Sequence, residues 1–242
     1  MSPQLQAIWM YLAASPLLGL ALTLLAYQGA LFIYQRSGNH PLANPVLLAV
    51  AFLMLLLQAT GTSYQTYFDG AQFVHFLLGP ATVALAVPLY RHFRKVRAML
   101  LPLLAALLAG SLTAIVSAMA IGKLLGASPA TILSLAPKSV TTPIAMGIAE
   151  GIGGIPSLTA GMVIVTGIFG AVAYPYLFNL IRVRDPAAQG FAIGLAAHGI
   201  GTARAMQINP QMGAFAALAM SLNGLLTALL IPLLLPFIKN TL

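Results

Sequence analysis

The sequence predicts an all-α integral membrane protein that crosses the bilayer several times. Of the 242 residues, 60% are hydrophobic and only 6% are charged, whereas an ordinary soluble domain is about a quarter charged. Residues 5–35, 98–122, 151–181 and 205–238 contain no Asp, Glu, Lys or Arg. Each stretch can hold the roughly 20 apolar residues that one span requires. We therefore expect a single transmembrane domain over residues 1–242, with about seven or eight membrane elements.

The N-terminal part is predicted to contain a short apolar segment, two spans and a broken region. The short segment covers residues 4–13, the first span covers 15–34, and the second opens at Asn44-Pro45 and fades near 58–61. Residues 62–97 begin with polar side chains and then become apolar. Because Gly and Pro interrupt helices, we expect two half-helices there, joined at Gly79-Pro80.

The remaining residues are predicted to alternate continuous spans with two further broken segments. The continuous spans cover residues 98–122, Pro156 to about Leu180, and about 212–238. The first broken segment, residues 126–153, is interrupted by the run Pro137 to Pro143. The second starts at Asp185-Pro186, a strong helix-start signal, breaks at His198 to Thr202, and ends at Asn209-Pro210.

Two of the broken segments resemble each other. Residues 142–148 and 202–208 share Thr, Ala, Met and Ile at the same offsets. Paired interrupted segments in corresponding places are the best sequence indication of a transporter's binding site. We therefore expect an internal repeat, with halves at about 1–97 and 98–242.

The basic residues indicate an orientation, since Lys and Arg concentrate on the cytoplasmic side. The cluster at residues 91–97 is expected to be cytoplasmic. Arg182 and Arg184 join it if residues 126–153 enter and leave the membrane on the opposite side. Arg36 joins them if residues 68–97 cross as one broken span, although a re-entrant hairpin is the alternative. Lys123 and Lys239 would then face outward.

The first break contains the residues that best fit an anion site. Lys138 lies between two half-helices, where a lysine costs several kcal/mol unless it is paired or hydrated. Thr142 followed by Pro143 is typical of an N-cap with proline at the first helical position, and the free N–H groups of such a helix start attract anions. With the hydroxyls of Ser139, Thr141 and Thr142 this predicts a carboxylate or phosphate site. The alternative is an interfacial lysine that extends to water.

The second break offers similar groups. His198, Gly199 and Gly201 would let the chain turn, because glycine tolerates positive φ. Thr202 would cap the next half-helix and Arg204 would lie in its first turn, where a guanidinium can hold a carboxylate through two donors. Arg204 could instead pair with Glu150 or with helix-end carbonyls.

Two titratable residues could couple transport to protons. His198 is either a neutral packing residue or a proton acceptor. Glu150, the one acid inside an apolar segment, could be a counter-ion for Lys138 or Arg204, a proton carrier, or an exposed helix end. Gly147/Gly151 and Gly190/Gly194, at four-residue spacing, predict close helix contacts.

Other functional classes are poorly supported by the sequence. No cysteine is present and the four His and three acids are scattered, so we expect no metal site and no cofactor. Zinc-protease and nucleophile-elbow motifs are absent, which argues against an enzyme. There is no basic face on a soluble domain, so nucleic acid is not an expected partner.

The two broken segments carry a family resemblance. The run PKSVTTPIAMGIAEGIGGIPSLTAGMVIVTGIFGA (137–171) and the run AIGLAAHGIGTARAM (192–206) resemble signature stretches of the LrgB/CidB family of bacterial membrane proteins. The resemblance implies that Pro137 and Pro143 belong to the signature, together with the candidate binding residues, which are Lys138, Ser139, Thr141, Thr142, His198, Gly199, Gly201, Thr202 and Arg204.

The resemblance also implies functions and partners. Family members are described as antiholin-like, or as modulators of murein hydrolase export and autolysis. Other family members behave as carriers of small monocarboxylates such as pyruvate, and a plant plastid relative exchanges glycolate and glycerate. A small four-span LrgA/CidA-like membrane protein is the expected partner, beside a carboxylate anion and the lipid bilayer, and we expect a homo-oligomer in the bacterial cytoplasmic membrane. The leading hypothesis is a secondary carrier of small carboxylates, and the alternative is an antiholin-like regulator without its own substrate.

Overall fold

The computed structural model describes residues 16–38, 43–77, 80, 83–84 and 86–239. Within these ranges the regular elements are all helices, which confirms the predicted all-α class for the described residues. Contacts divide the chain into two compact units, residues 1–84 and 85–242. The internal repeat, with halves at about 1–97 and 98–242, stays a prediction.

The described residues of the first unit form three helices, α2 (Pro16–Arg36), α3 (Pro45–Thr60) and α4 (Tyr64–Phe76). Helix α2 packs on both of the others. Asn44 caps α3, because its side-chain oxygen accepts hydrogen bonds from the backbone of Val46 and Leu47, so this span opens where the sequence predicted. The segment predicted at residues 4–13 lies outside the described residues, as does Gly79 of the predicted junction.

Four helices of the described residues are long and apolar enough to cross a membrane. They are α2, α8 (Leu100–Leu124), α11 (Pro156–Leu180) and α13 (Pro210–Lys239). The last three agree with the predicted spans to within a few residues. Leu101, Leu225 and Leu229 are exposed on these helices, as expected for faces that contact lipid. The total of seven or eight membrane elements stays a prediction.

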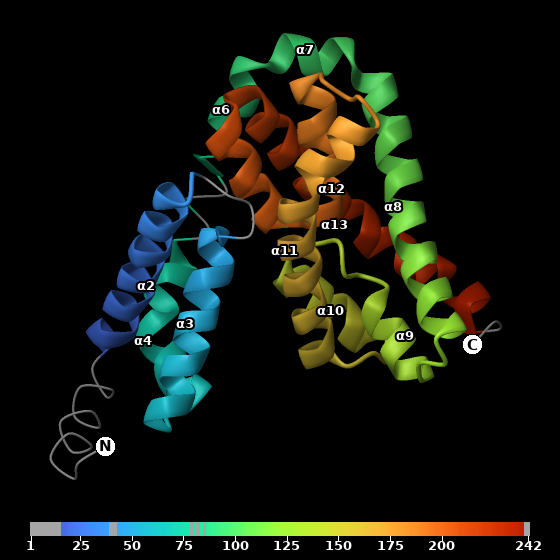
Figure 1. Cartoon of the computed structure of the whole chain (residues 1–242). Helices are drawn as coiled ribbons and strands as arrows, with labels where there is room; N and C mark the ends of the chain where they lie inside the picture. The colour runs from blue at the N-terminus through green and yellow to red at the C-terminus, as the bar shows by residue number, and fades with distance from the viewer. Residues whose placement is uncertain (1–15, 39–42, 78–79, 81–82, 85, 240–242) are drawn as a thin grey trace, which may run out of the picture. The chain divides into compact units, whose positions relative to one another are not determined.

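The first broken segment of the second unit consists of α9 (Pro129–Leu135), an irregular run at 136–141 and α10 (Thr142–Ile152). The start of α11 (Pro156–Leu180) packs on α9, since the Ile155 N–H donates to the Ser134 hydroxyl at 2.7 Å and the Thr159 hydroxyl donates to the Ser134 carbonyl at 3.0 Å. Figure 1 shows α9 and α10 together at the lower end of the unit. The predicted interruption between two half-helices is therefore present.

The second broken segment, α12 (Pro186–Ile208), turns back on itself at one residue. His198 has φ 41° and ψ −130°, inside an otherwise helical run. A Cβ on Gly201 would lie 2.7 Å from the Ala197 Cβ and 2.8 Å from the Ile193 carbonyl oxygen. The second arm of α12 (199–208) therefore folds back against its first arm (186–197).

Helix α13 packs extensively on α12. Gly190 and Gly194 bring the first arm of α12 against the backbone of Met212 and Ala216 so closely that a Cβ on either glycine would overlap a carbonyl oxygen. The predicted close contact at this glycine pair is confirmed. The matching prediction for Gly147/Gly151 is wrong for contacts among the described residues, because beyond its chain neighbours and its own helix backbone a Cβ there would meet no atom within 4 Å. Periodicity marks a face on which a helix can pack, but tertiary structure decides whether a neighbour covers it.

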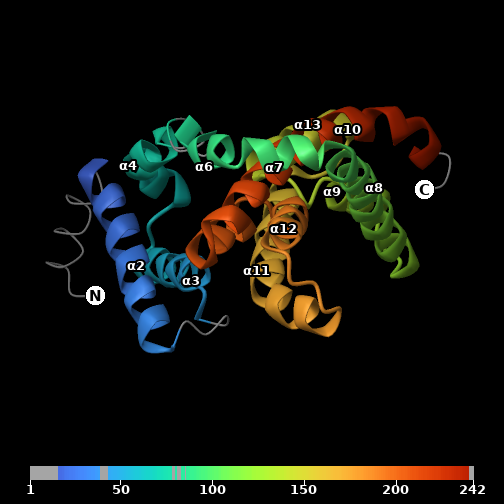
Figure 2. The ribbon, with the colours of Figure 1, turned by 90° about the horizontal axis from the view of Figure 1, so that it is seen from above.

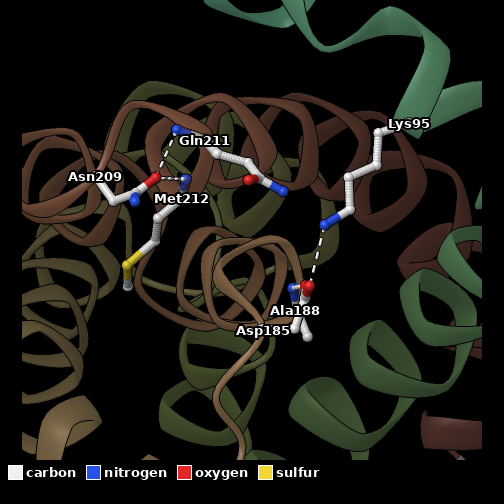
Figure 3. A network of polar contacts seen from close by, with 6 residues as sticks. All are labelled: Lys95, Asp185, Ala188, Asn209, Gln211 and Met212. Carbon is white, nitrogen blue, oxygen red and sulfur yellow. Dashed lines mark hydrogen bonds and ion pairs between the residues drawn. The ribbon is translucent and has the colours of Figure 1, made fainter.

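Two short basic helices, α6 (Ala86–Arg91) and α7 (Phe93–Ala98), lead into α8, and Figure 2 shows this succession from above. Lys95 of α7 forms an ion pair of 3.0 Å with Asp185, which caps α12 by accepting from the Ala188 N–H at 2.9 Å. Asn209 caps α13 through the Gln211 and Met212 N–H groups, and Figure 3 shows this cap near the Lys95–Asp185 pair. The basic cluster and the α11–α12 connection with Arg182 and Arg184 thus lie at one end of the unit.

Low pH is expected to destabilise the end of the unit that contains the Lys95–Asp185 ion pair. The Ala188 N–H and then the Lys95 ammonium hold the pKa of Asp185 below its ordinary value of 3.8. A lowered pKa means that the stabilisation is fully present above 3.8 and is lost as the pH falls through the lower, folded value. Because half of the Asp185 side chain is exposed, we expect the ion pair to contribute less than about 1 kcal/mol.

Thermal unfolding in detergent between pH 6 and pH 2.5 checks this expectation. Asp185→Asn should show a smaller acid-induced loss of Tm than the unmodified protein, because it has no carboxylate to protonate. The control is Asp69→Asn, since Asp69 is also exposed and accepts a hydrogen bond from Gln65. An identical pH profile for Asp185→Asn and the unmodified protein would contradict the assignment.

Candidate functional site

A cavity of about 720 Å³ lies in the second unit, among α8, α11, the first arm of α12 and the break after α9. Its walls are mostly apolar, and the polar side chains among them are Thr113, Lys138, Ser139, Thr166 and Tyr174. Pockets for small molecules commonly measure about 300–1,000 Å³ and pair apolar walls with a few polar groups. The cavity therefore suits a small molecule with apolar parts and one polar or charged group.

Lys138 supplies the one ammonium in this wall. Its Nζ donates to the Ser139 hydroxyl at 3.3 Å, and its side chain is half-buried. The three acids of the chain, Asp69, Glu150 and Asp185, all belong to the described residues, and none of them forms an ion pair with Lys138. A cation among membrane-spanning helices is costly unless it is paired, so this geometry favours an anionic ligand.

The backbone around Lys138 is well packed. Pro137, Ser139 and Val140 are buried, while Thr141 stands at the N-cap of α10 without a side-chain capping bond. The prediction that Thr142 caps this helix is wrong by one residue, since Thr142 is its first residue. Proline fits after it because the first N–H groups of a helix have no partner within that helix. Thr141 and Thr142 do not line the cavity.

His198 is held at the turn of α12. Its Nε2 lies 2.9 Å from the Val163 carbonyl oxygen of α11, and its side chain is only 4% exposed. A Cβ on Gly167 would lie 2.7 Å from His198 Cε1, so the ring fills the space beside that glycine. The neighbouring Ala197 lines the cavity, but His198 does not. His198 is thus a buried residue with a defined partner next to the cavity.

Three expectations about the second break are wrong. Because the helix resumes at Gly199, Thr202 lies inside it, and its hydroxyl donates to the His198 carbonyl at 2.7 Å rather than capping the helix. Arg204 lies beyond the first turn for the same reason. The residue with positive φ is His198 itself, whereas Gly199 and Gly201 are helical. Gly201 serves instead to let the two arms approach.

Arg204 and Glu150 are not brought to the cavity wall. An Nη of Arg204 donates to Gln207 Oε1 at 3.3 Å, on the second arm of α12. The Glu150 carboxylate is exposed on α10 and forms no ion pair in the described part of the chain. The structure therefore brings Lys138 and Ser139 into one cavity, and the joint binding by Lys138 and Arg204 stays a prediction.

Asn223 of α13 was not among the residues predicted from the sequence. It is 1% exposed, and its amide donates to the Ser139 carbonyl at 3.1 Å and to the Leu195 carbonyl at 3.0 Å. Asn223 therefore connects the break that carries Lys138 with α12. An amide side chain in the middle of a long apolar helix could have indicated this residue, since such side chains form hydrogen bonds to neighbouring helices.

Comparison with known proteins identifies the family. A family model described as LrgB-like matches residues 23–237, nearly the whole chain. The chain belongs to the LrgB-like family. The resemblance carried by the two signature stretches is thereby confirmed, and both breaks of this LrgB-like chain lie inside the matched region.

Relatives of this LrgB-like chain match over almost their full lengths. The chain is 37% identical to "Uncharacterized protein YwbG" of Bacillus subtilis (strain 168) over 91% of its own residues and 98% of the relative's. It is 30% identical to "Antiholin-like protein LrgB" of Bacillus mycoides (strain KBAB4) and of Bacillus cereus (strain B4264), over 93% of this chain and 97% of each relative. No solved structure matches the chain.

Proposed function

We propose that this LrgB-like chain is a secondary carrier of small monocarboxylates in the bacterial cytoplasmic membrane. The observation that carries the proposal is Lys138, which lines an apolar cavity and forms no ion pair with Asp69, Glu150 or Asp185. One positive charge suits one carboxylate, and the apolar walls suit a short carbon chain. The charge of the substrate would replace the missing counter-ion.

The arrangement of the two broken segments supports transport. In secondary carriers, substrate sites lie at interrupted helices near the bilayer midplane. Here the break at 136–141 and the first arm of α12 both contribute to the cavity wall. By the positive-inside rule, the end with α7 and the α11–α12 connection would face the cytoplasm.

Uptake of a labelled monocarboxylate panel into proteoliposomes tests the proposal. We expect saturable uptake of at least one two- or three-carbon acid, with slower uptake of the matching neutral amide, because the amide lacks the charge that Lys138 would pair. Absence of uptake for the whole panel, with and without a pH gradient, would overturn the carrier function. Currents that do not saturate would indicate a channel.

Proton coupling stays a prediction. Of the two candidate residues, His198 is better placed for it than Glu150. His198 is buried beside the cavity, whereas Glu150 is exposed away from it. We expect His198→Gln to reduce the stimulation of uptake by an inward proton gradient, while Glu150→Gln retains it. The reverse pattern would assign the coupling to Glu150 instead.

The second candidate function is an antiholin-like regulator without its own substrate. The names of two relatives favour this function. The chain would then act by assembling with a small LrgA-like membrane protein or with further copies of itself. This function predicts that lysis phenotypes survive Lys138→Ala as long as assembly persists. The carrier function predicts that they change together with uptake.

A further inference from the structure

Asn223 makes a complete set of hydrogen bonds in the centre of the second unit. Its two N–H groups donate to the carbonyl oxygens of Ser139 and Leu195. Its Oδ1 accepts from the Ser111 hydroxyl of α8 at 2.6 Å and from the Thr227 hydroxyl at 3.2 Å. A side-chain amide has two donor hydrogens and an oxygen that accepts two bonds, so the orientation of this amide is fixed from both sides.

The two carbonyl oxygens that Asn223 binds belong to the interrupted segments. Ser139 lies in the irregular run next to Lys138, and Leu195 lies within the last turn before the reversal at His198. Carbonyl groups in the last turn of a helix have no partner further along that helix. An unpaired carbonyl among apolar helices costs several kcal/mol. The Asn223 amide therefore supplies the hydrogen-bond donors for carbonyl groups that the two interruptions leave without a helical partner.

We propose that Asn223 is a positioning residue for Lys138. It holds the Ser139 carbonyl and the end of the first arm of α12 at a fixed separation, and so sets where the Lys138 ammonium stands in the cavity wall. Lys138 has no ion pair and its ammonium bonds only to the adjacent Ser139 among the described residues. Its place therefore depends on the backbone that Asn223 holds. The consequence for substrate affinity rests on the proposed carrier function, but the positioning itself does not.

Thiol labelling tests the positioning without any substrate. The chain has no cysteine, so Lys138→Cys places a single thiol at the cavity wall, and its reaction with a water-soluble methanethiosulfonate reports access. Adding Asn223→Leu should raise the labelling rate about tenfold, because the bonds to the Ser139 and Leu195 carbonyl oxygens are lost and the run at 136–141 loosens. Adding Asn223→Asp, which keeps the size but loses both N–H donors, should also accelerate labelling.

Asn209→Ala is the matched control. Asn209 caps α13 through the Gln211 and Met212 N–H groups and forms no bond to either break, so the labelling rate of Lys138→Cys should stay unchanged. If both Asn223 variants elute as folded protein and label at the control rate, the positioning role is overturned. If Asn223→Leu does not fold, Asn223→Asp gives the same comparison, because it also lacks both N–H donors.

Transport kinetics separate this inference from the proposed function. With Lys138 intact, Asn223→Asp should raise the KM for the transported monocarboxylate about tenfold, because the ammonium loses its place, and Asn209→Ala should leave KM unchanged. If the unmodified protein transports no carboxylate, the carrier function fails while labelling still decides the role of Asn223. If transport is present but neither KM nor labelling changes, the positioning role fails alone.

Discussion

Lys138→Ala is expected to reduce saturable monocarboxylate uptake about a hundredfold, because truncating one partner of a buried, hydrogen-bonded charge pair costs roughly 2–5 kcal/mol. The remaining cavity is apolar and would have to take up an uncompensated carboxylate. Initial uptake rates into proteoliposomes measure the effect. Lys138→Arg should retain part of the activity, since it keeps the positive charge in a different shape.

Lys123→Ala is the control for Lys138→Ala. Lys123 is also a lysine near a helix end in the second unit, but it is exposed and does not line the cavity, so uptake should not change. Arg204→Ala in the same assay shows whether the guanidinium belongs to the site. Unchanged uptake in Lys138→Ala and Arg204→Ala would contradict the assignment of both residues.

Gly194→Ala is expected to destabilise the protein strongly. Its Cβ would overlap the carbonyl oxygen of Ala216, so the first arm of α12 and α13 would have to separate. Overpacking of this kind costs typically 1–3 kcal/mol and sometimes more. For a protein of this size, a loss of about 3 kcal/mol lowers Tm by about 10 °C. Gly190→Ala should behave similarly, since its Cβ would overlap the Met212 carbonyl oxygen.

Gly147→Ala and Gly151→Ala are the matched controls for the glycine pair on α12. Both positions lie in α10 and leave room for a Cβ. Replacing glycine by alanine inside a helix then favours the folded state by roughly 0.5–1 kcal/mol. Thermal unfolding in detergent should therefore show Tm values equal to or above that of the unmodified protein. A similar loss of Tm at all four positions would refute the packing argument.

The local sequence pattern of apolar, charged and helix-breaking residues predicted most helices of the second unit. It could do so because a membrane span depends on the apolar character of residues that are consecutive in one helix. The charge-free stretches gave α8, α11 and α13 nearly residue by residue, and Pro137 to Pro143 marked the first break. Lys138 was identified because a cation is conspicuous in an apolar run. These inferences need only the cost of placing a charge, or an interrupted helix, in lipid.

The errors lie where the backbone conformation depends on distant neighbours. The turn of α12 occupies one residue rather than the five between His198 and Thr202, because Val163 and Gly167 of α11 hold the His198 ring in place. Because the turn is a single residue, Thr202 and Arg204 lie inside the following helix and not, as predicted, at its N-cap and first turn. The same dependence separates Gly190/Gly194, which meets α13, from Gly147/Gly151, which meets no neighbour among the described residues.

By itself, the sequence determined that this chain is a helical membrane protein of the LrgB-like type with two interrupted segments and a lysine at the first. Only the tertiary structure decided that Lys138 faces an apolar cavity, that Arg204 lies outside its wall, and that Asn223 joins the two segments. Span formation is fixed by apolar residues that are near in sequence. The site depends on the hydrogen bonds from Asn223 to Ser139 and to Leu195, which join residues separated by 84 and by 28 positions in the sequence. No local sequence pattern specifies such bonds.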